Sequence, residues 1–464
     1  MSSLPGEQVP RGAARKVLCA ALKLKSGDRI ALFYDESTEE VANFFCEAAS
    51  DLGVQFQKHL IRIAEQKAYA LSQDGSPDLE FLAGYQAVLT CLTDNAECAL
   101  FRQHLVTQCV AEDRKVGHMP GVNEEILREA LNIDYSSAEQ ICDDLALILA
   151  VGRFGVLDTS AITSAGHMVR GTLKLDLGGI SRPSIVSSGV VPVGTWGNLP
   201  GGETFIAPIE AGATGDFIIT GSFENRVLHP QEFVILHFAD GRLQSIDGSP
   251  EIREEFANLL EKWKKSDALN YSNLAELGIG INERIRSLTG RALFDEKCSD
   301  TVHIALGSNY GYGGTVYSSV HKDLISWHPT LTIDGHPILT NGKRVYDRAT
   351  CRENIDEVEP SAAIKTKTFV GRSADIRCEH AEDGTLRVRR AVSSGRLCLY
   401  TIGDTSTSKD LSLLYKLLPP AAFNTQFDEL ASRAVKNLGW KKAKVACGLT
   451  ILQRHGAIAV SDGG

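Results

Sequence analysis

The chain has 464 residues and an ordinary globular composition, with 43% hydrophobic and 23% charged residues. Its length accommodates about two to four domains, which argues against a lone binding module. The formal net charge of -10 gives no general attraction to phosphate groups, so we expect neither nucleic acid nor an anionic membrane as a partner. The 11 cysteines form no C-x-x-C pair, and no apolar run resembles a signal peptide or a membrane span. We therefore expect free thiols in a cytoplasmic protein.

The first 150 residues alternate between short apolar runs and segments with helical periodicity. The predicted strands are, in chain order, 29–34, 54–61, 87–92 and 105–110. The predicted helices are 37–51, 95–104, 123–131 and 136–151. Alternation of this kind is typical of parallel βαβ units, so we assign residues 1–150 to an α/β domain.

Beyond residue 150 the sequence changes to short alternating segments rich in Gly, Thr, Ser and Pro. Strands are predicted at 172–177, 217–220, 232–238, 302–306 and 330–333, with one long charged helix over 250–266. These patterns indicate a β-rich domain over 151–349.

A charged, proline-containing stretch at 353–360 then predicts a linker into a small α+β extension over 350–464. In that extension we expect a hairpin of 385–392 with 397–402, a helix at 427–438 and a strand at 445–452.

Two acidic residues of the middle domain lie in unusual surroundings. Glu203 directly follows two glycines and precedes an apolar strand, so the backbone there can approach a ligand closely. A hairpin turn with a solvated acid is the plainer interpretation of that block. Glu276 is the only charged residue in the segment 275–282, where burial would raise its pKa unless a cation compensates. A metal ion would do so, although an acid at a domain edge explains this block equally well.

The third block runs from Asp295 to Asp323 and holds Glu296, His303 and His321. Side chains repeat every two residues along a strand, so His321 and Asp323 project from one face and can bind one ion. A single histidine among apolar residues, such as His303, is usually a satisfied core residue. Together with His321 and Asp323, which follow 18 and 20 residues later across a Gly-rich loop, it forms a plausible ligand set.

Several other chemistries have no support. The Gly-rich segment 307–314 is followed by a strand-like pattern, so the helix amino terminus of a dinucleotide site is missing. The sequence contains no P-loop, no H-E-x-x-H and no G-x-S-x-G. Nucleophilic serine catalysis is therefore not predicted.

The segments NLPGGETFIAP, ELGIGIN, DEKCSDTVHIALG, the H-K-D triplet and HPTLTIDGHPILTNG occur in this order between residues 198 and 342. With them the chain resembles the thermophilic metalloaminopeptidase family, which is typified by aminopeptidase T. The βαβ beginning of the chain also fits that family, whereas residues 350–464 lie outside the resemblance. By resemblance alone we expect a homodimer that acts on a peptide or another small molecule.

The resemblance implies a role for each matching residue. It implies metal ligation by Glu203, Glu276, His303, His321 and Asp323, with Glu276 as a bridge between two ions. Glu296 matches the general base of the family, and Tyr310 matches a tyrosine near the reacting carbonyl. Three carboxylates and two imidazoles suit a pair of zinc, cobalt or manganese ions, so the expected reaction is hydrolysis of the amino-terminal residue of peptides through a metal-activated water.

Two alternatives stay open. The same superfamily contains dihydroxypyridine ring-cleaving dioxygenases, and here His303, His321 and Asp323 would hold one Fe(II), with Glu203 and Glu276 contacting the ligands or the substrate. The stretch between His303 and His321 is also shorter than in the best-known aminopeptidases. The second alternative is an inactive peptide-binding descendant. Retention of every candidate ligand argues against it, because crowded uncompensated acids are costly.

Overall fold

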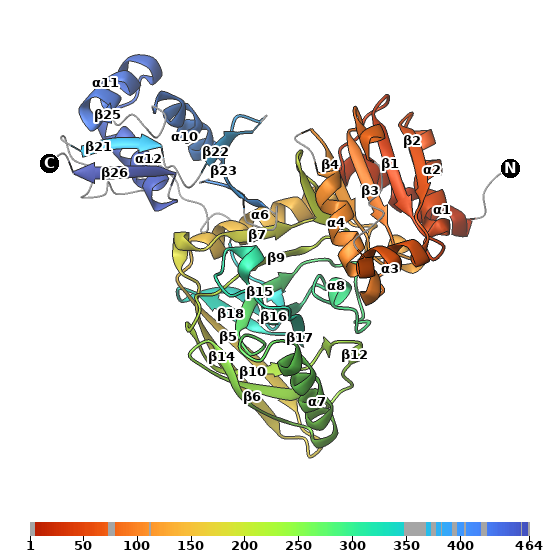
Figure 1. Ribbon diagram of the computed structural model, residues 1–464. Helices are drawn as coiled ribbons and strands as arrows, with labels where there is room; N and C mark the ends of the chain where they lie inside the picture. The colour runs from red at the N-terminus through yellow and green to blue at the C-terminus, as the bar shows by residue number, and fades with distance from the viewer. Residues whose placement is uncertain are drawn as a thin grey trace. The chain divides into compact units, whose positions relative to one another are not determined.

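The computed structural model describes most of the chain and has the expected α/β class (Figure 1). The described residues are 5–72, 79–110, 113–347, 368–372, 377–381, 383–391, 397–402, 405–418, 425–455 and 457–462. The predicted linker at 353–360 lies outside them. A five-stranded parallel sheet, two large sheets that contain antiparallel strand pairs and a carboxyl-terminal part with helices make up the fold.

Two compact units divide the chain, and each is assembled from stretches that are distant in sequence. Unit 1 comprises Met1–Cys142, Ser187–Glu203 and Ile279–Ser299. Unit 2 comprises Asp143–Val186, Thr204–Gly278 and Asp300–Gly464. The predicted domain boundaries after residues 150 and 349 stay a prediction.

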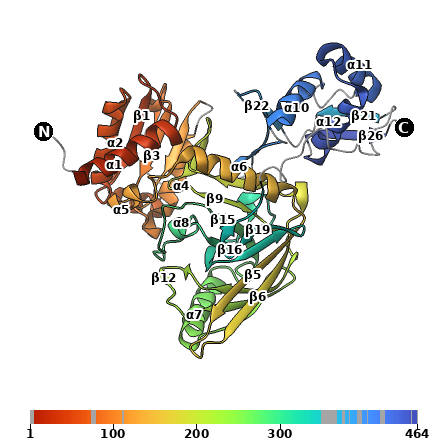
Figure 2. The ribbon, with the colours of Figure 1, turned by 180° about the vertical axis from the view of Figure 1, so that it is seen from behind.

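Unit 1 contains the parallel sheet, with strand order β2-β1-β3-β4-β8. The strands are β1 (Arg29–Tyr34), β2 (Gln55–Leu60), β3 (Ala87–Cys91), β4 (Lys115–His118) and β8 (Thr195–Asn198). Its helices include α1 (Pro5–Lys16), α2 (Glu39–Asp51), α3 (Ile63–Ser72), α4 (Ala99–Cys109), α5 (Glu124–Arg128) and α8 (Ala292–Asp295). Side chains of α3 and α4, including Tyr69 and Phe101, share one core with Phe33 and Val88 of the sheet. Figure 2 shows the same unit from behind.

The alternation of strands and helices in unit 1 is confirmed, with one error. The predicted strands at 29–34, 54–61 and 87–92 correspond to β1, β2 and β3. The strand predicted at 105–110 is wrong, because that segment belongs mostly to α4. Phe101, Leu105 and Cys109 are buried at a spacing of four residues, which is the period of a helix face and not of a strand. The fourth strand is β4, whose sequence Lys-Val-Gly-His contains only one strongly apolar residue. Such a short polar segment has no apolar run that would predict a strand.

An eight-stranded antiparallel sheet lies in unit 2, with strand order β14-β13-β10-β6-β5-β18-β19-β20. Its strands are β5 (Phe154–Ile162), β6 (Met168–Asp176), β10 (Ala213–Ile219), β13 (Val234–Ala239), β14 (Arg242–Gly248), β18 (Thr330–Ile333), β19 (His336–Thr340) and β20 (Lys343–Arg344). The long helix α7 (Pro250–Ser266) has the predicted bounds, and its Phe256 packs edge-on against Phe223 and Trp263.

A second sheet of seven strands carries the residues that the sequence motifs single out. Its order is β12-β11-β17-β16-β15-β9-β7. The strands are β7 (Ser184–Ser187), β9 (Glu203–Ile206), β11 (Ser222–Phe223), β12 (Arg226–Val227), β15 (Leu274–Gly280), β16 (Thr301–Gly307) and β17 (His321–Trp327). All residues of β15 and β16 are buried, which agrees with their near-continuous apolar sequences.

In the carboxyl-terminal part, the predicted hairpin is confirmed by the antiparallel pairing of β23 (Leu386–Ala391) with β24 (Leu397–Thr401). The predicted helix is confirmed as α11 (Phe427–Leu438). The strand predicted at 445–452 is wrong, because the segment lies in α12 (Lys442–Arg454). Val445, Leu449 and Leu452 follow helical spacing and are buried in the local core.

The remaining elements of this part are short strands and helices. They are β21 (Thr368–Arg372), β22 (Arg377–His380), α10 (Thr405–Leu417), β25 (Thr425–Gln426) and β26 (Ile458–Asp462). Earlier in the chain, α6 (Tyr135–Val151) begins in unit 1 and ends in unit 2. Within the described ranges, no helix has both the length and the apolar character that a membrane crossing requires.

Gly280 ends β15 at a very close approach between two backbone segments of unit 1. A Cβ at this position would lie 2.0 Å from the carbonyl oxygen of Cys298. Since that obstacle is backbone and cannot rotate away, no larger residue fits without moving the turn after Glu296 and Lys297.

We expect Gly280→Ala to lower the free energy of unfolding by about 1–3 kcal/mol, the usual cost of overpacking. Gly12→Ala is the matched control, since a Cβ there meets no atom within 4 Å and the residue lies in α1. That control should raise stability by about 0.5–1 kcal/mol. Urea unfolding followed by circular dichroism compares the two, and equal stability of Gly280→Ala and wild type would contradict the close approach.

Candidate metal centre

Four neighbouring strands of the seven-stranded sheet, β17-β16-β15-β9, supply the five predicted ligands. Glu203 begins β9, Glu276 lies in β15, His303 lies in β16, and His321 and Asp323 lie in β17. In the antiparallel pairing of β16 with β17, Asp323 lies opposite Ala305 and His321 opposite Gly307. Positions 303, 305 and 307 share a face, so the strand register places both histidines and Asp323 on the same side.

Unit 2 brings four of these groups together, and we call Glu276, His303, His321 and Asp323 the histidine cluster. Glu276 lies between the two imidazoles, with its Oε1 3.1 Å from His303 Nε2 and its Oε2 3.4 Å from His321 Nε2. His321 Nε2 is also 3.5 Å from Asp323 Oδ1. His303 and Glu276 are buried, and His321 and Asp323 are partly buried.

A backbone carbonyl orients the imidazole of His321. Its Nδ1 lies 2.8 Å from the carbonyl oxygen of Ser308, which only accepts, so Nδ1 must donate. The other ring nitrogen, Nε2, then faces Glu276 and Asp323. Histidines that bind metals are commonly held in this way through the nitrogen that does not bind.

The electrostatics of the histidine cluster favour a cation. Burial by itself lowers the pKa of His321, but Tyr312, Asp323 and Glu276 outweigh this effect and hold the pKa well above its usual value. Burial raises the pKa of Glu276, yet hydrogen bonds from His303 and His321 leave it lowered. The negative surroundings that retain protons on the imidazole also attract a divalent ion.

Glu203, Glu296 and Lys297 form a second group, in unit 1, which we call the acid–lysine cluster. Lys297 Nζ donates to Glu203 Oε1 at 2.6 Å and also to Glu296 Oε1. The side chain of Lys297 is 0% exposed, that of Glu203 2% and that of Glu296 12%. Burial would lower the pKa of Lys297, but the two carboxylates raise it above the ordinary lysine value.

The turn before Glu203 is held by Asn282, the last residue of the ELGIGIN motif. The Asn282 side-chain amide donates to the carbonyl oxygens of Ala130 and Gly201, each at 3.0 Å. Gly202 has φ +127, and a Cβ there would lie 2.6 Å from that of Asn282. The glycine is therefore required both by its backbone conformation and by the close approach. Asn282 and the two glycines together fix where the Glu203 carboxylate points.

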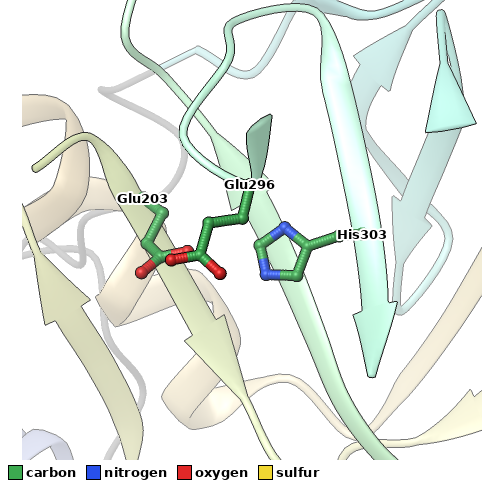
Figure 3. Close-up of side chains that lie close together, drawn as sticks. All are labelled: Glu203, Glu296 and His303. Atoms are coloured by element: carbon green, nitrogen blue, oxygen red, sulfur yellow. The ribbon is translucent and has the colours of Figure 1, made fainter. Parts of the chain in front are cut away.

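In the histidine cluster, Glu276, His321 and Asp323 each offer a ligand atom that lies within 4.8 Å of the other two. In unit 1, the carboxylates of Glu203 and Glu296 lie side by side (Figure 3). Carboxylate oxygens and imidazole nitrogens suit zinc, cobalt, manganese or ferrous ions, so the donor chemistry fits a metal.

Gly278 provides the space that His303 needs. A Cβ at Gly278 would lie 2.1 Å from His303 Nε2. Glu276 and Gly278 are two residues apart in β15 and therefore project from the same face of the strand. On that face Glu276 contacts the His303 ring, and the missing side chain of Gly278 leaves room for it.

Tyr310 and Tyr312, the first two tyrosines after His303, have different surroundings in the structure. Tyr310, the residue matched by resemblance, is 53% exposed and packs edge-on against Tyr317. Tyr312 is the one whose ring lies 5.2 Å from the His321 ring, and it also packs against Phe205. The role of Tyr310 near a reacting carbonyl stays a prediction. Tyr312 was not singled out in the sequence, because nothing in the spacing distinguishes it from its neighbour.

An ion pair anchors the loop that carries these tyrosines. Arg182 contacts Glu210 and also donates to the carbonyl oxygen of Gly313 at 2.5 Å. Glu210 Oε1 accepts from the Asn309 side chain at 2.9 Å and from the Thr315 N–H at 2.7 Å. The loop beside His321 is thus held in place by a charge network within unit 2.

No protein-family model and no curated protein sequence matches this chain. Two solved structures match it over almost their whole lengths. One is 2,5-dihydroxypyridine dioxygenase from Pseudomonas putida KT2440, with a TM-score of 0.54, 15% identity, and coverage of 74% of this chain and 99% of that chain. The other is wild-type aminopeptidase T (AmpT) from Thermus thermophilus, with a TM-score of 0.52, 14% identity, and coverage of 73% and 99%.

The chain has the fold that these two enzymes share. This confirms the fold that the sequence resemblance implied. The two similarities are nearly equal, and at such identities they establish the fold alone. The reaction has to be inferred from the site.

We expect His321→Ala to weaken divalent metal binding by more than about 100-fold, since losing even a group that only orients a ligand costs about 10–100-fold. Elemental analysis after dialysis against limiting metal measures the effect. His237→Ala is the matched control, because His237 forms a similar imidazole–carboxylate pair with Asp216 at 2.7 Å in β13 and β10. Unchanged metal content in His321→Ala would exclude the histidine cluster as the site.

Glu210 should give the fold a defined pH dependence. Burial raises the pKa of Glu210, but hydrogen bonds from Thr315 and Asn309 and the charge of Arg182 lower it to about 2. A pKa below the unfolded value of about 4.5 means that the carboxylate stabilises the fold above that pH and loses this effect as the pH falls toward 2.

The melting temperature of Glu210→Gln should therefore lie below that of wild type near pH 6, and the gap should narrow below about pH 4.5. Thermal unfolding at several pH values measures this gap. Glu251→Gln, an exposed change in the first turn of α7, should show no such narrowing. A gap that stays constant down to about pH 2.5 would show that Glu210 does not act through its charge.

Proposed function

We propose that the protein is a metal-dependent aminopeptidase that removes the amino-terminal residue of peptides through a metal-activated water. The observation that carries this proposal is the histidine cluster, in which ligand atoms of Glu276, His321 and Asp323 lie within 4.8 Å of one another and His303 contacts Glu276. A site that only binds peptides has no need to gather two carboxylates and two imidazoles away from water, because buried acids are costly unless a cation compensates them. The shared fold of aminopeptidase T supports the same reaction.

Each side chain has a definite task in this proposal. Glu203, Glu276, His303, His321 and Asp323 would hold a pair of divalent zinc, cobalt or manganese ions. When bound, such an ion polarises a substrate carbonyl and lowers the pKa of a water molecule. Glu296 is the residue that takes the proton from water and passes it to the leaving amine, and its 12% exposure leaves it some access to solvent. As part of the same proposal, the protein is a cytoplasmic homodimer.

One observation favours a second candidate, a single-iron dioxygenase that cleaves a hydroxylated aromatic ring. His303, His321 and Asp323 lie on one face of the sheet and supply the two imidazoles and one carboxylate that typify non-heme Fe(II) oxygenases. The dihydroxypyridine dioxygenase shares the fold.

Metal analysis combined with two activity assays separates these candidates. Protein purified without chelator should contain zinc, cobalt or manganese and should hydrolyse unblocked peptides but not peptides with acetylated amino termini. If the protein binds iron under anaerobic reconstitution and then consumes oxygen when dihydroxypyridine is added, the dioxygenase proposal would replace the aminopeptidase proposal. Absence of metal under both conditions would refute both enzymes and favour a peptide-binding protein.

We expect Glu296→Gln to lower kcat for peptide hydrolysis by about 10²–10⁴-fold, since a general base typically contributes that much, while binding of the ion in the histidine cluster stays nearly intact. Glu283→Gln removes an exposed carboxylate from the same segment and should retain wild-type kcat. Steady-state kinetics together with metal analysis of both variants measures the two effects. Wild-type turnover by Glu296→Gln would exclude it as the base.

A further inference from the structure

Lys297 is a completely buried cation inside the acid–lysine cluster. Its ammonium donates to Glu203 Oε1 at 2.6 Å and to Glu296 Oε1, and its side chain has no solvent exposure. A lysine is rarely buried to this degree unless it is paired. Here both acids that flank it are among those that a metal centre would use.

The ammonium and a metal ion need the same oxygens. The Lys297 group has three donors and no lone pair, so it cannot become a ligand, whereas the imidazoles beside Glu276 can. An ion bound by Glu203 and Glu296 would either displace Lys297 or lie close to its positive charge. Repulsion between like charges is weakly screened at a buried site, so both outcomes weaken binding of that ion.

In the histidine cluster, imidazoles face the carboxylates. Glu276 lies 3.1 Å from His303 Nε2 and 3.4 Å from His321 Nε2, and a neutral imidazole has a nitrogen lone pair that can bind a metal. The partners of Glu276 can therefore themselves become ligands, which an ammonium cannot.

We propose that Lys297 makes the metal centre unequal: one divalent ion binds tightly in the histidine cluster, and a second binds only weakly because it competes with Lys297 for Glu203 and Glu296. This inference rests on the proposed function only in requiring that the chain binds a divalent metal. In this proposal, Lys297 positions the carboxylates of Glu203 and Glu296 and limits how many metal ions the chain binds tightly.

The test is a calorimetric titration of the metal-free full-length chain with Co²⁺, with the absorption of bound Co²⁺ followed in parallel. Wild type should bind one Co²⁺ at least about 100-fold more tightly than a second. Lys297→Gln keeps hydrogen-bond donors but removes the charge, so it should tighten the second step by at least about 10-fold and leave the first almost unchanged.

Two controls separate charge from general disturbance. Lys297→Arg keeps the charge and should keep the weak second step. Lys343→Gln removes a lysine that pairs with Asp300 on the surface, and it should leave both steps unchanged. His321→Ala should abolish the tight step, which assigns that step to the histidine cluster.

The inference is overturned if wild type binds two ions with equal affinity or binds none, or if folded Lys297→Gln binds the second ion no more tightly than wild type does. The wild-type titration decides the first point even if Lys297→Gln does not fold, which circular dichroism reveals. The proposed function fails separately: unequal Co²⁺ binding without peptide hydrolysis refutes the aminopeptidase and leaves the role of Lys297 intact.

Discussion

The constraint on which the rest of this structure depends is the withdrawal of four carboxylates from water: Glu203 and Glu276 are buried, and Glu296 and Asp323 are partly buried. Glu203, Glu276, Glu296 and Asp323 cannot stay ionised out of water unless cations or hydrogen-bond donors compensate them. The chain supplies two imidazoles for Glu276 and Asp323 and one ammonium for Glu203 and Glu296. A cation bound at the candidate site would therefore also stabilise the fold, because it would compensate these carboxylates.

Glycines make this concentration of charge possible by letting backbones approach. Gly278 leaves room for the His303 imidazole, Gly280 for the Cys298 carbonyl and Gly202 for Asn282. Each of these contacts would be blocked by a single Cβ. The glycine-punctuated motifs thus serve packing around the acids and not flexibility, because the positions they occupy are buried and in contact.

The same fold occurs in aminopeptidase T and in a dihydroxypyridine dioxygenase, so the architecture alone does not choose the reaction. What differs between a two-ion and a one-ion centre is how many of the buried acids are compensated by metal and how many by the protein. In this chain the acid–lysine cluster already contains its own cation. The number of metal ions that the site can hold therefore depends on the Lys297 ammonium as well as on the ligands.

The sequence by itself determined the strands and helices of strong periodicity, such as 29–34 and 250–266. The family resemblance singled out the five candidate ligands, and their role as ligands stays a prediction. The sequence patterns misassigned 105–110 and 445–452, where apolar runs are equally compatible with a helix until their burial pattern is known. Lys297 stands in the DEK motif, yet its contact with Glu203, 94 positions earlier, could not be inferred. Only the tertiary structure decided that pairing, along with the choice of Tyr312 over Tyr310 beside His321 and the entry of β8 into the parallel sheet. The physical reason is that periodicity and residue chemistry act locally, whereas the compensation of a buried charge depends on which distant side chain the fold brings within a few ångströms of it.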